Sequence, residues 1–181
     1  MSAPSISTLA ELERKVVVGV GGLAVSNDQN TILTTYSLGS CLGVTIYDPV
    51  CHAGGLLHAM LPDSAVDPFK AAGRPAMFVD TGIAVLLRAI YALKASKHRL
   101  QICVAGGAHF LDNNGIFNIG WRNFAALARL LASEGLSIDA KDVGGLVSRT
   151  LNLQLRTGEV RLKSSGQSGE TIMFRGYANI G

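Results

Sequence analysis

The sequence lacks several features that would define its class at once. No apolar run approaches the ~18 residues of a membrane-spanning helix, and the polar segment 1–15 has no apolar centre typical of a secretory signal peptide. Aromatic residues make up only 6% and charged residues 16% of the 181 positions. The basic residues form no stripe with interleaved aromatics, although the net charge is +3. We therefore expect a cytoplasmic protein without membrane insertion and without a nucleic-acid partner.

Cysteine is also scarce, and its spacing argues against a structural role. The three cysteines, Cys41, Cys51 and Cys103, are an odd number in a chain with no export signal, so free thiols in a reducing compartment are expected. Cys41, Cys51, His52 and His58 are spaced Cys-x9-Cys-His-x5-His, which matches no common zinc pattern. We expect no metal, and a zinc-stabilised module is the less favoured alternative. The glycine-rich turns lack the helix and acidic residue of a dinucleotide fingerprint, so no nucleotide is expected either.

What the sequence does have is a large apolar fraction and many glycines. Apolar residues make up 48% of the chain, and several of its 21 glycines occur in pairs at the ends of apolar runs, where tight turns and close backbone contacts are common. The pattern predicts one domain over 16–175, between tails 1–15 and 176–181. Helical periodicity predicts helices near 76–97 and 122–134, the second ended by Gly135. Strands are predicted at 15–20, 31–37, 42–47, 54–61, 100–105, 136–143, 148–156, 159–163 and 171–175, which gives an α+β layered domain.

Cys41 is the residue with the most chemical promise. It follows Gly39 and Ser40 at a break between two predicted strands, a position that exposes both the thiol and the neighbouring backbone N–H groups. A thiol, a nearby imidazole and backbone donors are the parts that nucleophilic acyl transfer needs. His58 is the favoured partner over His52, His98 and His109. The alternative is that Cys41 is a buried small apolar residue and His58 a hydrogen-bonded core histidine.

A set of short motifs then resembles a known family. In chain order they are Thr35-Tyr-Ser-Leu-Gly-Ser-Cys41, Tyr47-Asp-Pro49, Gly54-Gly-Leu-Leu-His58-Ala-Met-Leu-Pro62, Gly106-Gly-Ala108, Asn118-Ile-Gly-Trp-Arg-Asn123, Asp142-Val-Gly-Gly145 and Arg149. Together they resemble CheD, the family of chemoreceptor glutamine deamidases of bacterial chemotaxis. The resemblance covers about 16–163, with no match in the polar start or the glycine-rich end of the chain.

The resemblance implies a fold, a reaction and a set of partners. The fold would be a β-sandwich flanked by helices, similar to the deamidase domain of cytotoxic necrotising factors. Cys41 would be the nucleophile, His58 the general acid and base, and Thr35 the residue that orients the imidazole of a protein-glutamine glutaminase that needs no cofactor. The implied partners are the cytoplasmic domains of methyl-accepting chemoreceptors and a CheC-type phosphatase. The alternative function is a non-catalytic chemotaxis adaptor that binds these same partners.

Four further positions are candidates for the surroundings of the nucleophile. Backbone N–H groups at Ser40 and Cys41 are expected to form the oxyanion hole. Asn118 and Arg122, together with Asn123, either shape a substrate groove or cap the second helix.

Overall fold

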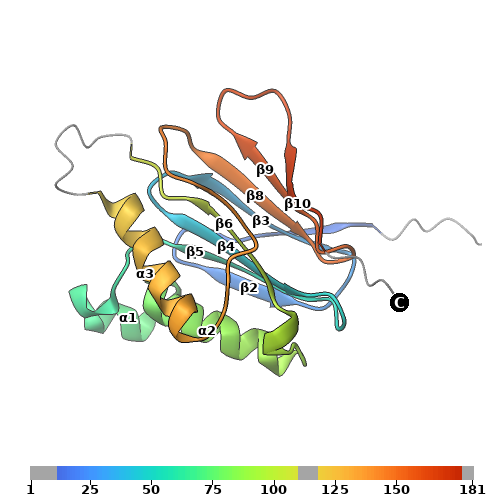
Figure 1. Ribbon diagram of the computed structural model, residues 1–181, viewed down its shortest axis with the longest axis horizontal. Coiled ribbons are helices and arrows are strands. Elements are labelled where there is room, and N and C mark those ends of the chain that lie inside the picture. The colour runs from blue at the N-terminus through green and yellow to red at the C-terminus, as the bar shows by residue number, and fades with distance from the viewer. Residues whose placement is uncertain (1–11, 110–117, 177–181) are drawn as a thin grey trace, which may run out of the picture.

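The protein is built from two stacked β-sheets with helices covering the outer face of one of them (Figure 1). The computed structural model describes residues 12–109 and 118–176. The expected α+β sandwich flanked by helices is confirmed. Most of the two predicted tails, at 1–11 and 177–181, lies outside the described residues.

Each sheet has five strands, and their order within the sheet differs from their order along the chain. The first sheet has the order β1-β3-β8-β9-β10 and the second the order β2-β5-β4-β6-β7. The chain therefore changes sheets between β1 and β2, between β2 and β3, between β3 and β4, and between β7 and β8. Their bounds are β1 (Arg14–Val17), β2 (Leu23–Ser26), β3 (Thr31–Leu38), β4 (Leu42–Asp48), β5 (Ala53–Ala59), β6 (Gln101–Gly106), β7 (Ala140–Val143), β8 (Arg149–Gln154), β9 (Val160–Ser164) and β10 (Thr171–Phe174).

Two longer helices supply the outer layer. They are α2 (Val79–Ala92) and α3 (Ile119–Ser133), and a short α1 (Pro68–Gly73) lies near them. The predicted helix over 76–97 is too long at both ends, and Lys94 at a φ of 71° cannot continue it. Gly135, at a φ of 65°, does follow the second helix as expected. Strand β2 and helix α1 were not predicted. Short 3₁₀ turns are Ser64–Val66, Pro75–Met77 and Lys97–Arg99.

Each face of the second sheet contributes to a different core. Leu42, Val44 and Ile46 of β4 pack with the apolar stripes of α2 and α3, whereas Tyr47 and Leu56 belong to the core between the sheets. All residues of β4 and β5 are buried, so these are the central strands. Because side chains alternate along a strand, His58 of β5 faces the same way as Leu56, toward the first sheet.

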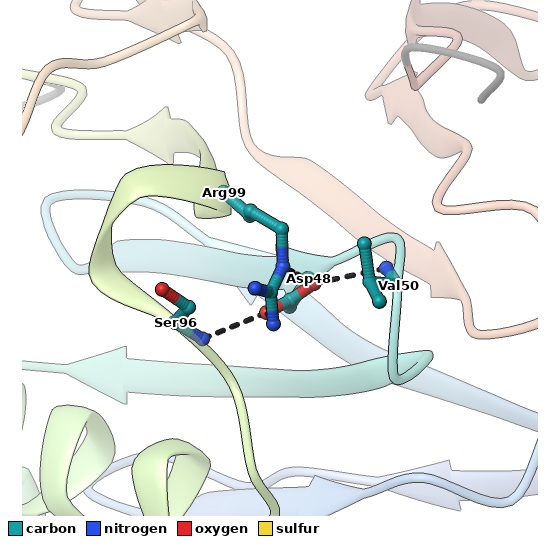
Figure 2. A network of polar contacts seen from close by, with 4 residues as sticks. All are labelled: Asp48, Val50, Ser96 and Arg99. Carbon is teal, nitrogen blue, oxygen red and sulfur yellow. Dashed lines mark hydrogen bonds and ion pairs between the residues drawn. The ribbon is translucent and has the colours of Figure 1, made fainter. Parts of the chain in front are cut away.

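An ion pair between buried Asp48 and partly exposed Arg99 fixes the end of β4 that lies away from Cys41. Figure 2 shows the Asp48 carboxylate accepting hydrogen bonds from the Arg99 side chain and from the backbone N–H groups of Ser96 and Val50. The shortest bonds, from Arg99 Nη2 and Ser96 N, are both 2.7 Å. Burial alone would raise the pKa of Asp48, but these hydrogen bonds outweigh it and hold the pKa below its ordinary value. Asp48 thus ties the segment after α2 to the β4–β5 hairpin.

Replacing Asp48 by alanine is expected to destabilise the fold by about 2–4 kcal/mol, because three donors lose a fully buried acceptor. Urea unfolding followed by circular dichroism measures the loss. Lys70→Ala, which removes only an exposed ion pair with Asp67, should change stability by less than about 0.5 kcal/mol. Equal effects of the two substitutions would contradict the structural role of Asp48.

Candidate active site

Cys41 lies in the short crossover that carries the chain from β3 to β4. The end of β3 is irregular, with a register shift between Thr35 and Leu38 and a φ of 57° at Ser37. Cys41 is a free thiol, half-buried, and packs against the core between the sheets. The crossover therefore places the sulfur at the edge of the inter-sheet core, with partial access to solvent.

Three successive carbonyl groups of this crossover accept hydrogen bonds from residues that lie outside the crossover. The N–H of Ala108 donates to the Gly39 carbonyl at 2.8 Å, and the N–H of Gly107 donates to the Cys41 carbonyl at 2.8 Å. The Ser40 carbonyl accepts from Asn123 Nδ2 of α3 at 3.0 Å. Only glycine fits at Gly106, because its φ is 112° and a Cβ there would lie 2.2 Å from the Cys41 carbonyl oxygen. The backbone around the sulfur is thereby fixed.

The same arrangement leaves backbone donors near the sulfur without backbone acceptors. Within the described part of the chain, the N–H groups of Ser40 and Cys41 donate to no carbonyl. The N–H of Cys41 favours the thiolate, which offsets part of the rise that burial causes in the pKa of Cys41. Two donors at this position can stabilise a developing oxyanion.

His58 and Thr35 meet across the space between the sheets. Thr35 Oγ1 and His58 Nδ1 are 2.7 Å apart, and both residues are buried. The Thr35 hydroxyl donates to the Val18 carbonyl at 2.7 Å, so it is left to accept a hydrogen bond from Nδ1–H of a neutral imidazole. That places the proton on Nδ1 and leaves the lone pair on Nε2, which has no partner among the described residues. His58 is thus oriented with a free basic nitrogen.

Cys41 lies just before β4, and His58 lies in the neighbouring strand β5. His58 pairs with Gly43 of β4, and Cys41 precedes that glycine by two residues, diagonal to His58. Since Nε2 is unpartnered, the thiol and the imidazole are not hydrogen-bonded in this state. Burial raises the pKa of Cys41, with partial compensation from its own N–H, and burial lowers the pKa of His58 to about 4. At neutral pH the pair is therefore a neutral thiol beside a neutral imidazole.

The lowered pKa of His58 makes stability depend on pH. Between its ordinary value of 6.5 and about 4, the unfolded chain binds a proton that the folded chain does not, so stability is lost as pH falls through this window. Between pH 7 and pH 5 we expect His58 to account for a loss of at most about 2 kcal/mol. Urea unfolding of the wild type and of His58→Asn at both pH values isolates this contribution. An identical loss in the variant would contradict it.

The other predicted site residues lie in different settings. Asn118 is the N-cap of α3, where its side chain accepts a hydrogen bond from the N–H of Trp121 at 3.0 Å. Arg122 is exposed and lines a groove of about 600 Å³ with Pro62 and Trp121. Asn123, by contrast, is buried and contacts the crossover directly. Its signal in the sequence is its position four residues before Leu127, on the buried stripe of α3.

Cys51, His52 and Cys103 lie outside the crossover that carries Cys41. Cys51 and His52 lie in the turn after β4, at the end of the strand opposite Cys41, and Cys103 is buried in β6. In the ranges 12–109 and 118–176, no group of three His, Cys, Asp or Glu side chains is placed to hold a metal ion. No helix in these ranges is long and apolar enough to span a membrane.

Comparison with known proteins finds the same family by its family model and by the names of similar proteins. The family model "CheD chemotactic sensory transduction" matches residues 60–164, a stretch that begins just after His58. A protein of Syntrophus aciditrophicus named "Probable chemoreceptor glutamine deamidase CheD 1" is 45% identical over 151 residues, covering 83% of this chain and 94% of the relative. Similarly named relatives from Solibacter usitatus and Pyrococcus horikoshii are 40% and 43% identical, over 87% and 83% of this chain and 94% and 92% of their own lengths.

Proposed function

Because this chain belongs to the CheD family, we propose that it hydrolyses the side-chain amide of selected glutamines on chemoreceptors to glutamate. Cys41 is the nucleophile, His58 the general base and acid, and Thr35 the residue that orients His58. The relatives named as chemoreceptor glutamine deamidases support the reaction and its substrate. The observation that carries the assignment of residues is the Thr35–His58 hydrogen bond, which leaves Nε2 free beside the strand that Cys41 precedes.

The first half of the reaction forms a thioester. The Cys41 sulfur attacks the glutamine Cδ while its proton passes to His58 Nε2, and the N–H groups of Ser40 and Cys41 hold the resulting oxyanion. Burial keeps the resting thiol protonated, so proton transfer accompanies attack. As the tetrahedral intermediate collapses, the C–N bond breaks, and the proton held by His58 goes to the departing ammonia.

The second half returns the enzyme to its starting state. Water enters where ammonia left and gives a proton to Nε2 as its oxygen attacks the thioester carbonyl. The C–S bond then breaks, the sulfur regains the proton, and the product is a glutamate side chain. The net change is amide plus water to carboxylic acid plus ammonia. None of these steps uses a metal or an organic cofactor.

The surface beside the site suits a protein substrate. Tyr36, Met60 and Trp121 are neighbours in sequence of Thr35, His58 and Asn123, and their side chains are 44%, 39% and 65% exposed. The proposal has the protein substrate dock across these three side chains, which would then act as one contiguous apolar patch. The proposal places the enzyme in the cytoplasm, with 16–175 as the working domain, chemoreceptor cytoplasmic domains as substrates and a CheC-type phosphatase as a further partner.

Removing the Thr35 hydroxyl is expected to have a moderate effect. Thr35→Val keeps the shape of a buried side chain but removes the acceptor of Nδ1–H, so the tautomer and orientation of His58 are less well fixed. We expect kcat to fall about 10-fold, and Thr35→Ser to retain most of the activity. Initial rates of ammonia release test this. Unchanged activity in Thr35→Val would remove Thr35 from the proposed site.

The proposed function is tested by mass spectrometry on a chemoreceptor cytoplasmic fragment. Each deamidated glutamine gains about one dalton, and in ¹⁸O-enriched water the new carboxylate gains a further ~2 daltons because one oxygen comes from water. Peptide mapping then names the modified glutamines. The fragment without enzyme controls for spontaneous deamidation. No mass change with the wild type, while the fragment still binds, would favour the adaptor function and overturn the proposal.

A further inference from the structure

We infer that Asn123 is a positioning residue that orients the Ser40–Cys41 peptide, so that the Cys41 N–H faces the reacting carbonyl. This inference rests on the proposed function and deepens it. Asn123 lies on α3, far along the chain from both residues of that peptide, and its side chain is fully buried. It does not cap the helix, since Asn118 is the N-cap.

The side chain of Asn123 joins two separate parts of the site. Its Nδ2 donates to the Ser40 carbonyl at 3.0 Å and to the Met60 carbonyl at 3.1 Å. Ser40 precedes the nucleophile, and Met60 follows His58 by two residues. An amide nitrogen can satisfy two carbonyls, which a hydroxyl with its single proton cannot do. One side chain therefore sets the position of the nucleophile crossover relative to the strand that carries the base.

The bond to Ser40 also decides where the Cys41 N–H points. In a trans peptide the carbonyl and the following N–H point in opposite directions, so holding the Ser40 carbonyl toward α3 turns the Cys41 N–H away from α3. The neighbouring peptide is held in the same way by the backbone of Ala108, which fixes the Ser40 N–H. Asn123 is thus the side chain responsible for one of the two oxyanion donors. Without it, the Ser40 carbonyl loses this hydrogen bond, and only the neighbouring peptides restrain the Ser40–Cys41 peptide.

The remaining polar atom of Asn123 argues against a purely stabilising role. Its Oδ1 is buried and has no hydrogen-bond partner among the described residues. An unsatisfied buried acceptor is costly, and it offsets much of what the two donated hydrogen bonds contribute. A leucine of similar shape would avoid this cost but would leave the Ser40 and Met60 carbonyls without their donor, so we expect Asn123→Leu to be less stable than the wild type yet folded.

The test separates acyl transfer from simple reaction of the thiol. In a Cys51→Ala background, the wild-type chain and Asn123→Leu are compared in deamidation of the chemoreceptor fragment and in alkylation of Cys41 by iodoacetamide. Alkylation displaces iodide and forms no oxyanion, so it depends on the Cys41 N–H only to the lesser extent that this group favours the thiolate. We expect kcat to fall about 10²-fold with KM unchanged, and the alkylation rate to stay within about 3-fold. Asn152→Leu, at another buried asparagine whose Nδ2 donates to Glu170, is the matched control.

Each outcome has a distinct meaning. Unchanged kcat in Asn123→Leu would overturn the inference and leave the proposed function intact. A parallel loss of kcat and of Cys41 alkylation would show a collapsed crossover and would also overturn it. If Asn123→Leu does not fold, Asn123→Ala carries the same comparison, and unfolding of both would assign Asn123 to stability alone. Absence of deamidation by the wild type would instead refute the proposed function, on which the inference depends.

Discussion

Cys41→Ala is expected to lower the rate of glutamine hydrolysis by at least about 10⁴-fold while the protein remains folded. The substitution removes the atom that forms the thioester, and direct attack by water lacks both the nucleophilicity and the position of the sulfur. The thiol is half-buried at the edge of the inter-sheet core and makes no hydrogen bond to His58. Its loss should therefore change the free energy of unfolding by less than about 1 kcal/mol. Deamidation rates and urea unfolding of the same preparation measure the two effects.

A second cysteine of the same hairpin provides the matched control for that substitution. Cys51 is also a free, half-buried thiol, but it lies in the turn at the far end of β4. Cys51→Ala should leave the hydrolysis rate within about 2-fold of the wild type. Residual activity above about 1% in Cys41→Ala would assign the chemistry to another group. Retention of fragment binding in that variant would show that recognition and turnover are separate properties of the surface.

Local pattern was sufficient to predict most strands and the buried stripes of the two long helices. The strands over 31–38 and 42–48 show the β-branched and apolar residues that favour extended structure. Ile83, Leu86, Leu87 and Ile90 have the spacing of a helix packed on a sheet, as observed. The two elements that were missed are weakly patterned. Strand β2 has only four half-buried residues, and α1 is a short, largely exposed helix on which Phe69 is 93% exposed.

The pairing of strands could not be predicted from local pattern, and the site depends on it. Thr35 belongs to one sheet and His58 to the other, and they meet only because the sheets stack with β3 opposite β5. The residues between Thr35 and His58 show no local pattern that would indicate how the two sheets stack. Thr35 was therefore predicted only from resemblance to a family, whereas His58 was already the favoured partner of Cys41 from the residues themselves. The hydrogen bond from Asn123 to the Ser40 carbonyl is equally non-local, since it links α3 to a crossover 83 residues earlier in the chain.

The histidine substitution should have the second largest effect on catalysis. In His58→Asn the side-chain amide nitrogen takes the place of Nδ1 and can still donate to Thr35, but the basic nitrogen is gone. We expect kcat to fall about 10³-fold, which is the usual contribution of a general acid and base. His52→Asn is the matched control, because His52 Nδ1 contacts the Tyr47 hydroxyl at the opposite end of the hairpin. Retention of more than about a tenth of the wild-type rate would contradict the role of His58.

The pH profile of the same variant tests the neutral resting pair. In the wild type, the acid limb of kcat/KM should follow protonation of His58, whose pKa burial lowers to about 4, so activity persists well below pH 6.5. In His58→Asn only the ionised thiol can attack, and burial raises the pKa of Cys41. The residual activity should therefore increase through the alkaline range, without a plateau near neutrality. If the rate of the variant were instead constant around pH 7, another group would have to ionise Cys41. Without a base, almost none of the thiol is ionised at that pH.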